Sequence, residues 1–577
     1  MAGPTPGDSP STLSFGEQFR SLSGTYWICN LMEMLERLAY YGLRTVLPVY
    51  MVLAVEEGGP QFDHIQKAGI YFWWAAVQSF VPVISGGYAD RFGLKKTIGL
   101  SIAIKIVGYL VMAFALELAV MTSGGASTGV PGHWATLAWF TAGSLLLAFG
   151  TAVFKPAIQG LIASQFKEGT ASLGWAMFYQ VVNLGAFIGP PLAGVLRLMS
   201  WRWVFVCCAG IVALNYLLLP TIKEPPKAEE HLKPESFMTT LIKAAEGILE
   251  PRLLAFLAIF SGFWAMFYQL FDLLPNFITD WVDSSDVYAA LATPIFGLFG
   301  SSPPAEWMGM VPQEQLINVN AGLIMVFVFA VGYLTGFLRS MQAMIVGMLV
   351  AAIGIYSLGL STTGFWILGS IVLFSIGEMM ASPTKMRYFA GIAPEGKKAL
   401  YLGYVNATTG IGWSLGSMIA GTMYQTGGDK VVLARKHLTE VVGMSAEAVE
   451  KLPKTEVLPL LTETLGHADP MVTQALLYDT YSPQFVWEWF TVVGVVSMLG
   501  LIAFDQVTRR NAKWEETALI VITGLTCGIC YNPWIGGWFA VHMVARKFLG
   551  SRPVAVLILA EVGFYVLYSI ASSLMSI

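Results

Sequence analysis

Residues 86–96 read GGYADRFGLKK and connect two long apolar stretches. Glycine allows a tight turn and close approach of neighbouring backbone, and the carboxylate of Asp90 can cap the following helix or pair with a basic residue. The ordered positions are Gly86, Asp90, Arg91, Gly93, Lys95 and Lys96. Cytoplasmic loops of membrane proteins carry an excess of lysine and arginine. The segment therefore predicts a cytoplasmic loop between two membrane spans.

Composition indicates a protein whose surroundings are largely lipid. Of the 577 residues, 55% are hydrophobic and only 12% are charged, about half the charged fraction of an average soluble domain. A soluble chain of this length would divide into several domains with polar surfaces, and 33 Lys+Arg with 37 Asp+Glu are too few to cover them. The net charge of -4 gives no basic excess for nucleic acid. We therefore expect neither a soluble enzyme nor a nucleic-acid-binding protein.

Apolar stretches of membrane-spanning length recur along the chain. A helix needs about 20 apolar residues to cross a hydrocarbon core about 30 Å thick. Twelve stretches between charged or Pro/Gly-rich breaks reach this length, at residues 25–53, 66–89, 96–122, 133–157, 171–198, 201–221, 252–282, 315–337, 341–361, 363–393, 397–424 and 483–505.

Polar breaks divide these stretches into two groups of six. Lysine and arginine gather in the even-numbered connections, while the first and seventh loops are acidic, which places the N-terminus in the cytoplasm. We predict an all-α membrane protein with about 14 spans. Its expected parts are a disordered N-terminal tail at 1–24, an N-terminal six-helix bundle at 25–222, a cytoplasmic linker with an amphipathic helix at 223–251, a C-terminal six-helix bundle at 252–510 that includes an extracytoplasmic loop at 425–482, and extra hydrophobic helices at 511–577.

Charged residues interrupt the first apolar stretch. They lie with two tyrosines at offsets that share one helix face, at Glu33, Glu36, Arg37, Tyr40, Tyr41 and Arg44. Each charge near mid-membrane costs about 2.5–3.5 kcal/mol on insertion scales, so we expect this face to line a polar pathway. A purely structural salt bridge would explain Glu33 with Arg37 but leaves Glu36 without a role.

Several motifs resemble known families. The loop at 86–96, together with twelve spans and a central linker, resembles the major facilitator superfamily. Glu33-x-x-Glu36-Arg37 followed by Tyr40-Tyr41 resembles the signature of its proton-coupled oligopeptide transporter (POT) family. Four further segments are similar to that family: Gly150 to Pro156 with Lys155, Phe178-Tyr179 with Asn183 and Gly185, Phe263-Trp264 with Gln269, and Gly377-Glu378 with Ser382-Pro383.

The resemblance implies a function and a set of site residues. It implies symport of small peptides with protons by alternating access, with proton coupling at Glu33, Glu36 and Arg37. A peptide is a zwitterion, and Arg37 with Lys155 fits its carboxylate while Glu378 fits its amine. The implied substrate-binding residues are Arg37, Tyr40, Tyr41, Lys155, Asn183, Trp264, Tyr268 and Glu378. The expected partners are a small peptide, protons and the lipid bilayer, without nucleic acid, cofactor or metal.

Two departures from the family pattern leave alternatives open. Tyr268 stands where the family often has an acidic residue, and Asp272, four residues later, is the candidate replacement. Lys385 is a basic residue in a segment where the family pattern is usually less basic. We favour the interpretation that its side chain extends to the cytoplasmic interface over the alternative that it forms a salt bridge in a gate. Rival functions are transport of another solute, such as nitrate, an amino-acid derivative or a drug, and a non-transporting membrane sensor.

The C-terminal segment has two possible topologies. Residues 517–545 are apolar but are interrupted at 531–537 by Asn, Pro and Gly. A kinked crossing followed by a span at 553–575 would put Ile577 in the cytoplasm, whereas a re-entrant pair of half-helices would put it outside. We favour two ordinary spans, because a kinked helix satisfies most of its own backbone hydrogen bonds.

Overall fold

The computed structural model describes residues 14–123, 132–167, 170–224, 237–392, 398–510 and 513–575. Side chains at 83–92, and a few others within helices, lie outside this description. The predicted roles of Gly86, Asp90 and Arg91 therefore fall outside the described side chains.

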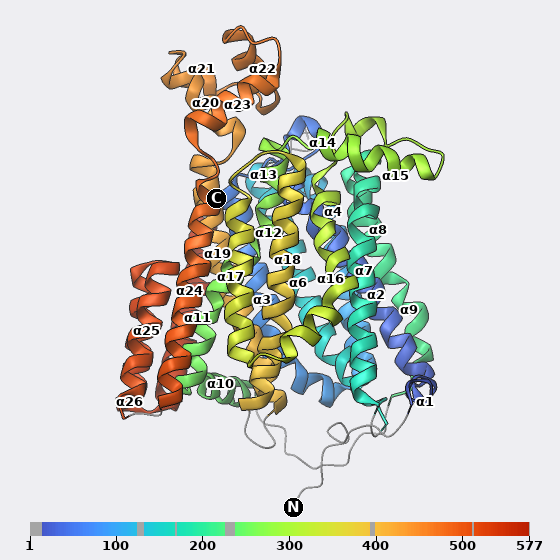
Figure 1. Ribbon diagram of the computed structural model, residues 1–577, viewed down its shortest axis with the longest axis vertical. Helices are drawn as coiled ribbons and strands as arrows, with labels where there is room; N and C mark the ends of the chain where they lie inside the picture. Colours follow the sequence, from blue (N-terminus) through green and yellow to red (C-terminus); the bar gives the residue numbers. More distant parts are fainter. Residues whose placement is uncertain are drawn as a thin grey trace, which may run out of the picture.

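Long helices occupy each of the twelve stretches that the sequence predicts (Figure 1). In chain order they are α2 (Gly24–Val52), α3 (His64–Phe92), α4 (Leu94–Ala113) with α5 (Ala115–Thr122), α6 (His133–Ala163), α7 (Ala171–Met199), α8 (Trp201–Ala213) with α9 (Asn215–Leu218), α11 (Pro251–Phe267) with α12 (Gln269–Asp272) and α13 (Leu274–Trp281), α16 (Gln313–Gly336), α17 (Ser340–Ser357), α18 (Gly364–Ile392), α19 (Lys398–Gly427) and α24 (Phe485–Arg510). Ten stretches of the described chain are long and apolar enough to cross a membrane. The predicted all-helical membrane fold is confirmed.

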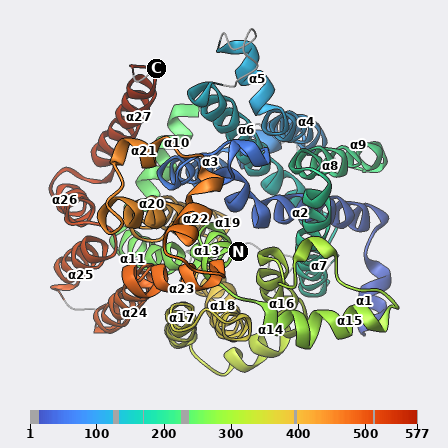
Figure 2. The same ribbon diagram turned by 90° about the horizontal axis from the view of Figure 1, so that it is seen from above.

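Two hydrophobic clusters hold the helices together. One joins residues between 22 and 222 and takes in Trp413, and the other joins residues between 249 and 555. Seen from above, α2, α4, α6 and α8 lie on one side of the molecule and α11, α17, α18 and α24 on the other (Figure 2). The two sides, here called the N-terminal and C-terminal halves, meet mainly where α3 packs on α19 and α7 packs on α16.

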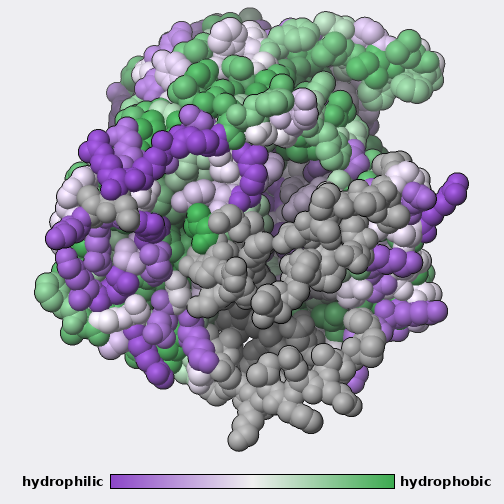
Figure 3. All heavy atoms as spheres, turned by 60° about the horizontal axis from the view of Figure 1, so that its bottom comes forward, coloured by the Kyte–Doolittle hydropathy of each residue, from purple (hydrophilic) through white to green (hydrophobic). Residues whose placement is uncertain are grey.

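Shorter helices lie at the two ends of the bundle. One end, here called the outer end, carries α20 (Lys430–Glu440), α21 (Ala446–Glu450), α22 (Lys454–Thr464) and α23 (Pro470–Tyr481), which project from it in Figure 1. Helices α14 (Ser285–Val287) and α15 (Thr293–Leu298), the π-turn η4 (Tyr288–Ala292) and the 3-10 turns η1 (Val55–Glu57) and η5 (Ala305–Trp307) also lie between long helices at this end. The opposite, inner end carries α1 (Phe15–Ser21), the amphipathic α10 (Phe237–Ile248) and η3 (Leu219–Thr221). Hydrophilic residues gather on the inner end, and hydrophobic ones cover much of the flank above it (Figure 3).

The expectation of a disordered tail through residue 24 is wrong for its last part. Phe15–Ser21 forms helix α1, because Ser14 and Glu17 make reciprocal capping bonds at its first turn. The Glu17 side chain accepts from the Ser14 backbone N–H at 2.8 Å. Residues 1–13 lie outside the described chain.

The structure of the C-terminal segment contradicts the prediction that residues 517–545 cross the membrane once as a kinked helix. Helices α25 (Glu515–Cys530) and α26 (Pro533–Leu549) form an antiparallel hairpin whose two ends lie at the inner end of the bundle (Figure 1). Arg546 Nη1 lies 2.9 Å from Glu516 Oε1, which ties the end of α26 to the start of α25. A Cβ at Gly536 would lie 2.2 Å from the backbone oxygen of Gly524, so glycine is required for this close packing.

The hairpin leaves α27 (Ser551–Met575) as the one long helix after it in the described chain. A 16-residue helix such as α25 is about 24 Å long, shorter than the hydrocarbon core of a bilayer. The structure therefore contradicts the single kinked crossing at 517–545 and does not confirm the exact total of about 14 spans. The sequence argument failed because it gave too little weight to Arg546 and Lys547, which stay at the inner end when the chain turns back at Asn532.

Candidate functional site

The ionisable face of α2 is buried in the N-terminal half. Glu33, Glu36 and Arg37 are 2%, 1% and 3% exposed. Arg37 Nε lies 3.2 Å from Glu33 Oε1, and its Nη2 pairs with Glu36 Oε2. One guanidinium therefore holds two carboxylates: Glu33 lies four residues before Arg37 on the same helix face, and the fork of guanidinium donors also reaches the adjacent Glu36.

A lysine of α4 completes this cluster and was missed by the sequence reasoning. Lys105 is 0% exposed, and its Nζ lies 3.5 Å from Glu36 Oε1 and 3.7 Å from the ring centroid of Phe154. A Cβ at Gly150 would come within 2.5 Å of Lys105 Cγ, so the glycine of the fourth-helix motif makes room for this side chain. The available signal was a lone lysine in an apolar span, which does not reveal its partner.

Lys155 lies beside the cluster on α6 but outside its ion pairs. It is close enough to Glu33 and Glu36 to interact with both electrostatically. Arg37 and Lys105 already provide one cation for each carboxylate, and no ion pair of Lys155 occurs in the described part of the chain. Its side chain is partly exposed inside the bundle. Lys155 is thus a cation beside this cluster that no carboxylate of the described chain pairs with.

The C-terminal half presents one carboxylate toward the centre. Glu378 Oε2 accepts a hydrogen bond from Asn320 Nδ2 at 2.9 Å, and the same amide donates to Ser375 Oγ at 2.9 Å. Glu378 is near enough to Tyr41 of α2 to interact with it electrostatically. Asn320 is a second residue that the sequence reasoning missed, since a single asparagine in an apolar stretch carries no pattern.

Aromatic side chains of both halves lie close to the charged face of α2. Tyr268 stacks on Trp413 with ring centroids 4.3 Å apart and an interplanar angle of 5°. The ring centroids of Trp264 and Tyr268, which lie on the same helical segment, are 5.8 Å apart. Arg37 sits 5.1 Å from the ring of Tyr40, whose hydroxyl donates to Gln78 at 3.1 Å.

Helix α7 is held against α2 by close glycine contacts. A Cβ at Gly185 would lie 2.5 Å from the backbone oxygen of Met34, and one at Gly189 would lie 2.4 Å from that of Leu38. Asn183 is part-buried on α7 between these positions and the inner end. The fifth-helix motif therefore positions α2, and a direct role of Asn183 toward a substrate remains a prediction.

Asp272 joins the two halves through an ion pair with Arg44. The carboxylate accepts from Arg44 Nη2 through Oδ1 and, through Oδ2, from Trp413 Nε1 at 2.7 Å and Ser417 Oγ at 2.9 Å. The helix is interrupted at Leu273, two residues before Pro275, because proline cannot donate a backbone hydrogen bond. Asp272, four residues after Tyr268, thus provides the carboxylate that pairs with Arg44.

Further polar contacts join the halves near the outer end. Lys67 Nζ donates to Asn276 Oδ1 at 2.6 Å, and Asn276 donates to the backbone oxygen of Pro48 at 3.0 Å. Arg197 Nε lies 2.8 Å from Glu314 Oε1. These contacts hold the outer ends of α2, α3 and α7 against α13 and α16.

The loop before α20 and helix α22 add to this closure. His64 Nε2 lies 3.0 Å from Asp429 Oδ2. Lys454 Nζ donates to the backbone oxygen of Val52 at 2.7 Å. The insertion between α19 and α24 is therefore bonded to the N-terminal half.

Lys385 does not follow the favoured interpretation of a lysine reaching the interface. It is 6% exposed, and its Nζ lies 3.7 Å from the ring centroid of Trp264. No ion pair of Lys385 is present among the residues described, so the alternative of a gate salt bridge is not observed either. The cation lies at an aromatic face inside the protein.

The described part of the 86–96 loop motif is anchored to the end of the sixth span. Gly93 has φ +98°, a conformation that side chains disfavour. The backbone N–H of Lys95 donates to Glu224 Oε1 at 2.7 Å, and Lys95 Nζ donates to the backbone oxygen of Pro220 at 3.0 Å. Lys96 is exposed.

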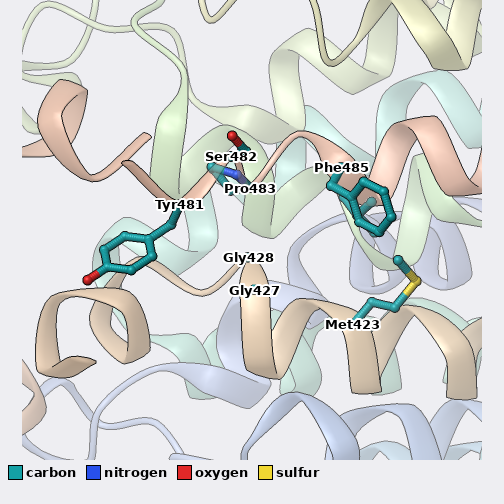
Figure 4. A pocket seen from close by; sticks show the side chains of 8 residues that line it. Met423, Gly427, Gly428, Tyr481, Ser482, Pro483 and Phe485 are labelled. Atoms are coloured by element: carbon teal, nitrogen blue, oxygen red, sulfur yellow. The ribbon is translucent and has the colours of Figure 1, made fainter. Parts of the chain in front are cut away.

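A pocket of about 240 Å³ lies where the insertion rejoins the bundle, apart from these charges. In Figure 4, Tyr481 and Phe485 lie on either side of Ser482 and Pro483, opposite Gly427–Gly428 at the end of α19. The lining is mainly apolar and has no ionisable group other than the Tyr481 phenol. We assign no substrate chemistry to it.

Comparisons with known proteins agree with this architecture. Residues 31–341 match the family model of the Major Facilitator Superfamily. A peptide transporter of Yersinia enterocolitica, YePEPT, is 29% identical over 208 residues, which are 36% of this chain and 36% of that protein. The multidrug resistance protein MdtH of Edwardsiella ictaluri is 21% identical over 61% of this chain and 75% of its own length.

A solved structure shares the fold. The crystal structure of a POT family transporter in complex with 5-aminolevulinic acid aligns with a TM-score of 0.54 and 17% sequence identity, covering 82% of this chain and 98% of that one.

Two packed groups of long helices, with a buried charged face on the first span, match the fold of a solved membrane transporter. The chain belongs to the Major Facilitator Superfamily. Within that superfamily its resemblance to the POT family is supported by the 29% identity with the Yersinia peptide transporter, and the solved POT structure shares its fold. It is an integral membrane protein with multiple membrane-spanning helices.

Proposed function

We propose that this protein is a symporter that carries small peptides together with protons. The observation that carries the proposal is the opposition of two charged regions across the bundle: the Glu33–Glu36–Arg37–Lys105 cluster with Lys155 in one half, and Glu378 in the other. A zwitterionic peptide fits between Lys155 and Glu378, because each terminus then meets the opposite charge.

Proton coupling follows from competition for cations in the cluster. A carboxylate buried among low-dielectric surroundings is ionised only while a cation compensates it. When a substrate carboxylate draws on Arg37 or Lys155, one of Glu33 and Glu36 loses part of its compensation and takes up a proton. Proton binding and peptide binding then favour each other, as linkage requires.

The conformational cycle is alternating access between the two halves. The outer contacts, led by Arg44–Asp272, keep the outer end closed in the state described here. We place the inner end, with α1 and α10, in the cytoplasm, since the short loops there carry the lysines and arginines. Residues 25–222 and 252–510 would move as two bundles about the central site, in the cell or inner membrane.

Uptake by proteoliposomes under an imposed pH gradient tests the proposal. We expect accumulation of a dipeptide such as Ala-Ala when the outside is acidic, and its loss when a protonophore collapses the gradient. Glu378→Gln should weaken uptake of ordinary dipeptides more than that of analogues without a free amino group. Equal loss of both substrates would assign Glu378 a structural or proton-carrying role.

Drug export is the second candidate, favoured by the similarity to MdtH. A pathway for lipophilic cationic drugs needs acidic side chains but does not need two buried basic side chains beside them. Proton-driven extrusion of a cationic dye, without uptake of any dipeptide, would replace the peptide proposal with this one. The same vesicles, loaded with dye, make the comparison direct.

A further inference from the structure

We propose that Lys385 forms a second anion subsite in the substrate pathway, so that the transporter prefers dipeptides whose second residue is acidic. This inference rests on the proposed function and adds a substrate class to it. The occupant is the side-chain carboxylate of Asp or Glu in the peptide.

The first argument is the charge balance around Lys385. Lys385 is 6% exposed, its Nζ lies 3.7 Å from the ring centroid of Trp264, and no carboxylate of the described chain pairs with it. Charges buried in a membrane protein are normally paired with one another or directed at a pathway. A cation–π contact supplies only part of the compensation that an ion pair gives.

The second argument is that the neighbouring carboxylates are already engaged. Glu33 and Glu36 are compensated by Arg37 and Lys105, and Glu378 accepts from Asn320. A bound dipeptide would satisfy Lys155 with its terminal carboxylate and Glu378 with its amine. Lys385 would remain the one cation of this set without an anion.

The third argument is reach. Lys385 lies seven residues after Glu378 on α18, which is about 10.5 Å along the helix axis. An extended dipeptide spans about 7 Å between its ends, and an acidic side chain at the second residue extends beyond that. Lys385 also lies close enough to Lys155 of the other half for their charges to interact. The two cations thus flank the position of the second residue.

Trp264 supports the same assignment. Its Nε1 is buried and has no hydrogen-bond partner in the described structure. An indole N–H donates and cannot accept, so an acceptor oxygen brought by a ligand would satisfy it. A carboxylate beside Lys385 supplies such an oxygen.

The test compares Ala-Glu with its neutral isostere Ala-Gln as competitors for uptake of labelled Ala-Ala. Proteoliposomes hold the full-length protein at zero membrane potential, so the extra charge of Ala-Glu does not bias transport. We expect Ala-Glu to compete at least fivefold better than Ala-Gln. Lys385→Gln should abolish this ratio while leaving competition by Ala-Gln within twofold, and Lys385→Arg should retain part of it.

Lys451→Gln is the matched control, because Lys451 is an exposed lysine of the insertion that pairs with Glu447. It should keep the wild-type ratio. If Lys385→Gln fails to fold, Ala-Glu and Ala-Gln are compared on the wild type by thermal shift, where Ala-Glu should stabilise more. Equal competition by the two peptides, or a preference that survives Lys385→Gln, overturns the subsite alone. Absence of any dipeptide uptake overturns the proposed function and the subsite with it.

Discussion

The substitution Asp272→Asn should release the outer end of the bundle. The variant keeps the size of the side chain and its contacts with Trp413 and Ser417, but removes the charge that faces Arg44. Arg44 and Asp272 are each 3% exposed, so Arg44 would remain buried beside the aromatic rings of Tyr71, Trp413 and Trp74, whose centroids lie 4.5, 4.9 and 5.9 Å from its Cζ.

The expected magnitude follows from the burial of the pair. Removing one member of a buried ion pair costs about 3–5 kcal/mol. If opening of the outer end separates Arg44 from Asp272 and hydrates both, this cost applies to the closed state alone. A difference of about 3 kcal/mol corresponds to roughly a hundredfold shift of the equilibrium toward outward opening.

Distances between spin labels at Val55 and Ser285 report on this equilibrium. Both positions are exposed at the outer end, one in each half, and the five native cysteines would be replaced first. We expect a longer distance component to grow in Asp272→Asn. The double variant Arg44→Met, Asp272→Leu removes both charges and should return most of the population to the closed distance. An unchanged distance distribution in Asp272→Asn would refute the assignment of this pair as an outer gate.

Further predictions concern other parts of the molecule. Glu36→Gln should abolish uptake driven by a proton gradient while exchange between equal peptide pools continues, and unchanged pH dependence would contradict a proton role. Gly189→Val should lower the melting temperature by several degrees, because its side chain meets the backbone of α2. Burial alone would raise the pKa of Asp429, but the hydrogen bond and charge of His64 hold it below its ordinary value. The wild type should therefore be more stable than Asp429→Asn at neutral pH, and this advantage should shrink as the pH falls below about 4; a constant difference would argue against the pairing. A reporter fused after Met575 should be active only outside the cytoplasm, since the α25–α26 hairpin returns the chain to the inner end before α27.

The spans could be predicted because apolar length is a local property of sequence. The break in the seventh span was not predicted, although Pro275 signals it, since hydropathy averages over short interruptions. The partners of the charged residues were harder to infer. Arg37 with Glu33 follows from helical spacing, whereas Glu36 with Lys105 depends on which face of α4 meets α2, and sequence does not give that rotation.

Lys385 illustrates the same limit. Its position near the end of α18 suggested that it reaches the interface, but tertiary packing places Trp264 beside it and encloses it. The C-terminal hairpin was misjudged for a different reason. Hydropathy treats α25 and α26 as one stretch, while Asn532, which caps α26 through Ile535, reverses the direction of the chain.

The bonds from Asp429 and Lys454 to the N-terminal half have a kinetic consequence. The insertion α20–α23 is covalently part of the C-terminal half, yet it hydrogen-bonds Val52 and His64 across the divide. In the proposed alternating-access cycle, opening of the outer end would break these two bonds together with Arg44–Asp272, so the insertion would add to the activation barrier of that step. Its sequence would then influence the turnover number without contacting a substrate.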